Sequence, residues 1–262
     1  MEPAFTETDT ELFKKYIKNA VNYFEYGSGG STYLAYKQNK IENIIAVESC
    51  KSWINKILRE LQEKKISKIN DKKIKKKLKF KFIQFTNKVA NLGLPIFEKK
   101  SNVKFLKNID NVGPNQLVDY EISRGTIKEV KLDSSLNVLY NIKHNDTLLE
   151  DIHPKLVIPE DKNILKKYVD YSSVITKYQD INFDLILIDG RCRVASALTC
   201  HNIIDENCIV LIDDFIDRKC YHMAVLDYYD IIEKGERMIA LKKKTNKKLS
   251  LEELEKYKYD IR

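Results

Sequence analysis

A glycine-rich run follows directly after a short β-type segment near the start of the chain. Its sequence is Glu25-Tyr26-Gly27-Ser28-Gly29-Gly30-Ser31-Thr32. Glycine permits a tight turn and lets backbone N–H groups approach an anionic or carboxylate-bearing ligand, helped by the N-terminus of a following helix. Ser31 or Thr32 can cap that helix. The run therefore predicts a ligand-binding turn, with Gly27, Ser28 and Gly29 at the ligand.

Two acidic residues flank this turn. Glu48 closes the next apolar run, 19 residues beyond Gly29, which is close to the roughly 20 expected for an acid that hydrogen-bonds a ribose diol. Ser49 follows it and is assigned to the same site. Glu25 precedes the first glycine, where it would repel a pyrophosphate but attract the cationic sulfonium and ammonium groups of S-adenosylmethionine (SAM). The pair thus favours SAM over NAD. The simpler alternative is a tight turn with a solvated Glu25 and a helix-capping Glu48.

A second set of acids follows two later apolar runs. Asp189 comes directly after residues 183–188, and Asp213 and Asp214 come after residues 208–212. Ligands of open α/β sheets lie at the carboxyl ends of the strands, and three carboxylates there suit Mg²⁺. Such an ion could bind two hydroxyl oxygens of a substrate and lower the pKa of one.

The same acids also admit a metal-free interpretation. Asp189, Asp214 or the nearby His222 could act as a general base. The non-catalytic alternative makes Asp213 or Asp214 a helix cap and Asp189 the start of a turn with Gly190. Arg191 and Arg193 either bind an anionic group of the substrate or pair with the neighbouring aspartates.

The elements that position these residues follow from hydrophobic periodicity. The order strand, glycine turn, helix, strand, acid and helix is the βαβ unit of a doubly wound sheet. We predict an α/β, Rossmann-like, doubly wound sheet of seven strands, the last antiparallel, in a single domain over residues 1–262 with an insertion at 97–160. The expected strands are 21–26, 41–47, 79–86, 183–188, 208–212, 229–233 and 238–242, and the expected helices are 8–20, 31–39, 52–66, 161–178, 191–204, 217–226 and 248–260.

The motifs together resemble class I SAM-dependent methyltransferases. The glycine run with Val47-Glu48-Ser49 and Trp53 looks like the cofactor half of that superfamily. Residues 183–195, which include Ile188-Asp189-Gly190-Arg191, and Val210-Leu211-Ile212-Asp213-Asp214-Phe215 look like the second half of a bacterial-type branch. The Asp-Gly and Asp-Asp layout is also distantly similar to metal-dependent sugar O-methyltransferases. That likeness implies Mg²⁺ and a substrate diol at Asp189, Asp213 and Asp214, although the two arginines do not match the sugar enzymes.

We therefore expect SAM-dependent methyl transfer to oxygen on a small-molecule or glycan acceptor, with SAM as cofactor and Mg²⁺ as a further ligand. One alternative is a non-catalytic nucleic-acid-binding protein on the same fold, and the other is an NAD-dependent oxidoreductase. The net charge of +8 arises from residues 64–81, which hold ten lysines and one acid. Aromatic residues are not interleaved through most of that run, so base stacking is unsupported and nucleic-acid binding is not favoured.

The chain carries no sign of a membrane or secretory address. Its acidic, polar start is not a signal peptide, and no apolar run approaches the roughly 20 residues that a spanning helix needs. We expect a cytoplasmic protein without a membrane partner. The oligomeric state stays open.

Overall fold

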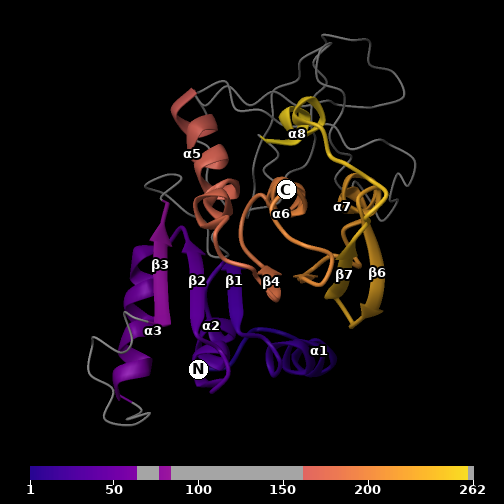
Figure 1. Ribbon diagram of the computed structural model, residues 1–262. Helices are drawn as coiled ribbons and strands as arrows, with labels where there is room; N and C mark the ends of the chain where they lie inside the picture. The colour runs from indigo at the N-terminus through magenta and orange to yellow at the C-terminus, as the bar shows by residue number, and fades with distance from the viewer. Residues whose placement is uncertain (64–76, 84–161, 259–262) are drawn as a thin grey trace, which may run out of the picture.

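One seven-stranded sheet forms the framework of the computed structural model, which describes residues 1–63, 77–83 and 162–258 (Figure 1). The strand order is β3-β2-β1-β4-β5-β7-β6, and β7 runs antiparallel to both of its neighbours. The four pairings among β3, β2, β1, β4 and β5 are parallel. The predicted fold class is confirmed. The predicted insertion at 97–160 lies outside the described residues.

The elements follow the predicted order along the chain. The strands are β1 Asn22–Tyr26, β2 Asn43–Glu48, β3 Leu78–Phe82, β4 Leu185–Ile188, β5 Ile209–Ile212, β6 Tyr229–Lys234 and β7 Ile239–Lys243. The helices are α1 Glu7–Ile17, α2 Gly30–Lys37, α3 Lys51–Glu63, α5 Lys162–Ser172, η1 Val174–Tyr178 (3-10), α6 Arg193–His201, α7 Lys219–Leu226 and α8 Leu251–Tyr257.

Helices cover both faces of the sheet, so the parallel strands are buried on both sides (Figure 1). On one face, α1, α2 and α3 pack against side chains such as Tyr23 and Ile44. On the other face, α5, α6 and α7 pack against Phe24 and Ile45. Successive strand residues point to opposite faces, and this alternation divides the apolar side chains into two cores.

The structure divides the predicted helix 161–178 into α5 and the 3-10 turn η1. The Ser172 hydroxyl donates to the carbonyl oxygen of Tyr168 at 3.1 Å, and such back-bonding of a serine competes with the helical ladder. The predicted helix 191–204 likewise begins two residues later, because Cys192 adopts a left-handed backbone with φ of 52°. These breaks shape the loops that leave the sheet beside the candidate site.

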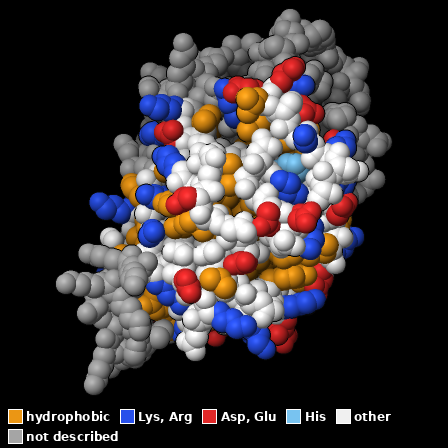
Figure 2. All heavy atoms as spheres, in the orientation of Figure 1, with side chains coloured by type: hydrophobic (Ala, Val, Ile, Leu, Met, Phe, Trp, Pro, Cys, Tyr) orange, Lys and Arg blue, Asp and Glu red, His pale blue; other side chains and the backbone are white. Residues whose placement is uncertain are grey.

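Charged side chains of both signs are interspersed over the face shown in Figure 2. Within the described residues, no helix is long and apolar enough to span a bilayer. The lysine-rich run at 64–81 falls mainly on residues 64–76, which lie outside the described part. Nucleic-acid binding by that run therefore stays an untested alternative.

Candidate functional site

The glycine turn follows β1 and contacts the chain at the carboxyl ends of β2 and β4. Gly27 has φ of +85° and donates its N–H to the carbonyl of Val47 at 2.8 Å. A Cβ at Gly27 would lie 2.7–2.8 Å from backbone atoms of Asp189 and Gly190. Gly27 thus permits a close backbone contact, and that contact sets Asp189 directly beside the turn.

Glu25 lies beneath the turn and has no exposed surface. Its carboxylate accepts hydrogen bonds from Tyr23 Oη at 2.8 Å, from Ser31 Oγ at 2.9 Å and from Thr32 Oγ1. The last two residues belong to the first turn of α2, so Glu25 fixes the start of that helix from below. Glu25 is not among the described residues that line the pocket over this turn, and its predicted contact with a ligand stays a prediction. Burial raises the pKa of Glu25 to about 7, although the three hydroxyl donors oppose the rise.

The raised pKa makes the stability of the fold depend on pH. Between the ordinary value of 4.5 and about 7, folded Glu25 holds a proton that the unfolded chain has released. The free energy of unfolding should therefore fall by about 3 kcal/mol as pH rises through this window. Glu25→Gln should remove this slope, because the glutamine amide does not titrate. The variant should still fold, because the hydroxyl partners can turn to serve an amide. Urea unfolding at several pH values measures it. The exposed Glu42→Gln is the control, and an unchanged slope in Glu25→Gln would contradict the assignment.

Glu48 links the glycine turn to the start of α3. One carboxylate oxygen accepts from Ser28 N at 2.9 Å and Ser28 Oγ at 2.7 Å. The other accepts from the backbone N–H groups of Ser49 and Cys50 at 2.7 and 2.8 Å. Sequence reasoning placed Glu48 and Ser28 at one site, and the structure brings them into contact. It also shows that both oxygens of Glu48 already have hydrogen-bond donors.

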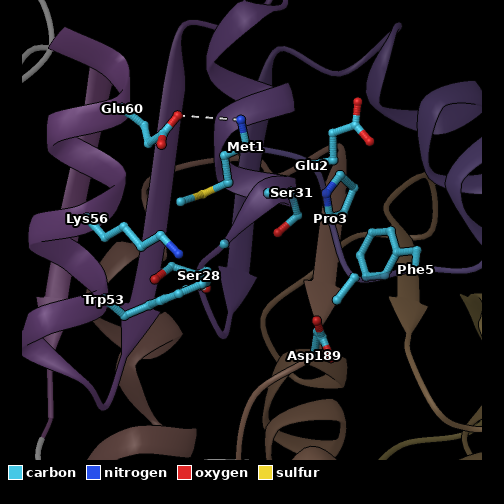
Figure 3. Close-up of a pocket in the computed structure, with 13 residues that line it drawn as sticks. Met1, Glu2, Pro3, Phe5, Ser28, Ser31, Trp53, Lys56, Glu60 and Asp189 are labelled. Atoms are coloured by element: carbon cyan, nitrogen blue, oxygen red, sulfur yellow. Dashed lines mark hydrogen bonds and ion pairs between the residues drawn. The ribbon is translucent and has the colours of Figure 1, made fainter. Parts of the chain in front are cut away.

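A pocket of about 390 Å³ opens over this turn (Figure 3). Trp53 forms part of its wall, and the indole N–H donates to the carbonyl of Ser28 at 2.5 Å. Asp189 lies on the opposite side from Trp53. The volume falls within the range of small-ligand sites. The residues that line the pocket are Met1, Glu2, Pro3, Ala4, Phe5, Ser28, Gly29, Gly30, Ser31, Trp53, Lys56, Glu60 and Asp189.

Residues 1–5, which we call the N-terminal strap, form one wall of the pocket that sequence reasoning missed. A Cβ on Gly30 would lie only 2.0 Å from the backbone nitrogen of Pro3. The Met1 amino group lies 3.6 Å from a carboxylate oxygen of Glu60 on α3 (Figure 3). No motif in these five residues announces the contact, because it depends on chain segments that meet only in the folded sheet.

Asp189, Asp213 and Asp214 meet at one rim beside the pocket, as the strand order predicted. Burial raises the pKa of both Asp189 and Asp213, and one carboxyl oxygen of Asp213 is buried with no hydrogen-bond partner among the described residues. Arg193 lies between the acids, with guanidinium nitrogens 3.3 Å from Asp189 and 3.1 Å from Asp214. Nearby carboxyl groups resist ionising together, and the charge of Asp213 adds to the rise in the pKa of Asp189. The pair can therefore accept or hold a proton next to the pocket.

Arginines surround the Asp214 carboxylate. Besides Arg193, it contacts Arg218 at 2.8 Å and Arg237 at 3.3 Å. Burial would raise the pKa of Asp214, but these three guanidinium groups outweigh burial and hold the pKa below its ordinary value. The open question for Arg193 is settled in favour of pairing with the aspartates.

These contacts do not fit the predicted Mg²⁺ site. Magnesium needs carboxylate oxygens that are open to it, whereas Asp214 is engaged by three arginines and Asp189 is paired with Arg193. In the described part of the chain, no three His, Cys, Asp or Glu side chains are placed to hold one metal ion.

The predicted base His222 packs against Phe215, the residue after Asp214. Its ring stacks on Phe215 with centroids 4.6 Å apart, and its Nε2 lies 2.9 Å from the Phe215 carbonyl oxygen. That contact occupies one ring nitrogen. His222 is not among the residues that line the pocket, whereas Asp189 is, and the predicted role of His222 as a base stays a prediction.

Comparison with known proteins concerns the fold. No family model and no curated protein matches the chain. A solved methyltransferase-like protein from Silicibacter pomeroyi has a TM-score of 0.60 at 16% identity, over 99% of this chain and 97% of its own. Two SAH-bound structures are more remote. The Podospora anserina methyltransferase PaMTH1 has a TM-score of 0.38 at 10% identity, over 90% of this chain and 77% of its own. The Bacillus cereus O-methyltransferase has a TM-score of 0.42 at 11% identity, over 92% of this chain and 84% of its own. The chain therefore has the Rossmann-like fold found in methyltransferases.

Proposed function

We propose that this chain is a SAM-dependent methyltransferase that acts on an oxygen of a small-molecule or glycan acceptor. The observation that carries the proposal is the convergence of Ser28, Glu48 and Asp189 around the backbone contact of the glycine turn. One pocket is thus bordered by a backbone turn at a helix N-terminus and by Asp189, an acid whose pKa is raised by burial.

The residues at the turn fit the parts of SAM. The N-terminus of α2 suits the amino-acid carboxylate, since helix N-termini favour anions. The N–H groups of Ser28 and Gly29 already donate to Glu48 and to Thr32 Oγ1. A ligand would therefore meet the helix start or replace one of these acceptors. Glu48 suits the ribose hydroxyls. Because both of its oxygens are engaged, a ribose hydroxyl has to replace a present donor, and the Ser28 hydroxyl can rotate away most easily. Above its raised pKa of about 7, Glu25 is ionised, and its negative charge below α2 then favours a cationic ligand.

Bound SAM would supply an electrophilic methyl group to the acceptor oxygen and leave as SAH. The protein must orient the acceptor hydroxyl and take its proton. Asp189 borders the pocket, and burial raises its pKa, which suits a carboxyl group that takes that proton. Alignment of the reacting groups accounts for most of the rate in such a transfer, so the walls of the pocket contribute as much as the base.

Calorimetric titration with SAM, SAH and NAD tests the proposal. We expect SAM and SAH to bind with dissociation constants in the micromolar range and NAD not to bind. Binding of NAD alone would favour the oxidoreductase alternative. If the chain instead binds RNA with strong salt dependence and ignores SAM and SAH, the nucleic-acid alternative replaces this one.

The engaged carboxylates lead to a prediction about metal. Titration with SAM in 5 mM EDTA should give the same affinity, within about twofold, as titration in excess Mg²⁺, because Asp214 is held by arginines. The same comparison applies to methyl transfer once an acceptor is known. A gain of tenfold or more in either quantity on adding Mg²⁺ would show that the acids rearrange to bind the ion.

A further inference from the structure

The arginines that pair with the aspartates at the rim differ in how much of each side chain is exposed. Arg193 is nearly covered, with 10% of its side chain exposed, whereas Arg218 is 46% exposed. Asp214 between them is 23% exposed. The cluster therefore has a covered inner arginine, Arg193, an acid, Asp214, and an outer arginine, Arg218, whose side chain is about half exposed to solvent.

The outer arginine is held in a fixed orientation. Arg218 donates from one terminal nitrogen to Asp214 at 2.8 Å and from the other to the Tyr221 hydroxyl at 2.9 Å. Its guanidinium carbon also lies 5.7 Å from the centre of the Tyr221 ring. A guanidinium has five N–H donors, so these two bonds leave others for a ligand. Fixing a flexible side chain in advance reduces the entropy that binding would otherwise cost.

The arginines share Asp214 as a partner. Asp214 has a left-handed φ of 53°, a conformation that aspartate adopts more readily than most residues other than glycine. Its carboxylate contacts Arg193, Arg218 and Arg237. One of these contacts orients the exposed guanidinium of Arg218.

We propose that Arg218 binds an anionic group, a carboxylate or a phosphate, on the acceptor. This inference rests on the proposed function and narrows its substrate class to acidic acceptors. Arg193 and Asp214 separate Arg218 from Asp189. The anionic group must therefore lie several bonds away from the hydroxyl that Asp189 receives. Asp214 and Tyr221 position Arg218 and do not touch the ligand.

Binding of simple anions to the full chain without SAM tests the proposal. Inorganic phosphate and acetate are titrated separately at constant ionic strength, with chloride as the balancing anion, and thermal unfolding is followed. We expect one of them to stabilise the wild type saturably and Arg218→Gln to weaken that binding at least tenfold. Arg218→Lys should be intermediate, because an ammonium lacks the planar fork. The arm that responds identifies phosphate or carboxylate.

Two further variants separate this site from general attraction to a basic protein. Tyr221→Phe keeps every charge but frees Arg218, and it should weaken anion binding about threefold to tenfold. Arg59→Gln removes an exposed arginine on α3 and should change nothing. Equal anion binding by wild type and Arg218→Gln, or no binding by either, would overturn the proposal. Because this titration contains no SAM, its result is independent of SAM binding. Failure of anion binding would overturn the role of Arg218, and failure of SAM binding would overturn the proposed function.

Discussion

Replacement of Gly27 by alanine is expected to cost roughly 2–5 kcal/mol of folding stability and to abolish SAM binding. The added Cβ would lie 2.7–2.8 Å from the backbone of Asp189 and Gly190, at a backbone φ of +85° that alanine rarely adopts. Neither neighbour can rotate away, because both contacts involve main-chain atoms. Since domains of this size are stable by only about 5–15 kcal/mol, a large share of the margin is lost. Urea unfolding measures the effect.

Gly29→Ala provides a matched control in the same turn. Gly29 has an extended φ of 177°, and the nearest atom to an added Cβ is Trp53 Nε1 at 3.6 Å. Stability should change by less than about 1 kcal/mol, while a methyl group at the pocket wall reduces SAM affinity. If Gly27→Ala is as stable as Gly29→Ala, the close contact between the ends of β1 and β4 is not as the structure has it.

Glu48→Gln should behave as a drastic change despite its similar shape. Both carboxylate oxygens accept backbone N–H groups, from Ser28 on one side and from Ser49 and Cys50 on the other. A glutamine amide must turn its NH₂ toward one of these donors, which leaves a covered N–H without an acceptor. Such a group costs about 1–3 kcal/mol. Loss of the charged acceptor for the ribose should weaken SAM binding by about 10- to 100-fold.

Calorimetry with SAM and urea unfolding read out the two parts of this effect separately. The exposed Glu42→Gln again serves as the control and should leave both quantities unchanged. If the Glu48→Gln protein has normal stability but binds SAM weakly, Glu48 contacts SAM but does not stabilise the fold by linking the glycine turn to α3. Normal SAM affinity in a folded Glu48→Gln protein would remove Glu48 from the cofactor site.

Local sequence patterns were sufficient for the sheet and for the glycine turn. Buried strands are short apolar runs, and acids such as Glu48 and Asp189 stand directly after them, so strand order alone brings them to one edge. The burial of Glu25 was not predictable in the same way. Its partners Ser31 and Thr32 lie beyond the glycine turn, in the first turn of α2, and their orientation depends on how α2 packs on the sheet.

Long-range contacts account for the remaining differences. Arg237 reaches Asp214 from the turn between β6 and β7, and it donates to the carbonyl of Ala4 in the N-terminal strap. Nothing in the spacing of these residues indicates their meeting. The Mg²⁺ prediction did not fit for this reason, because it counted carboxylates at one rim without the arginines that the fold brings to them.

Fluorescence of Trp53 tests most directly whether SAM occupies the pocket over the glycine turn. Trp53 is the sole tryptophan of the chain and its indole is bonded to Ser28, so its emission reports on this wall and no other. Titration with SAH should change the emission saturably, with a midpoint equal to the calorimetric dissociation constant. Calorimetric binding that leaves the Trp53 emission unchanged would place the ligand elsewhere and contradict the assignment of this site.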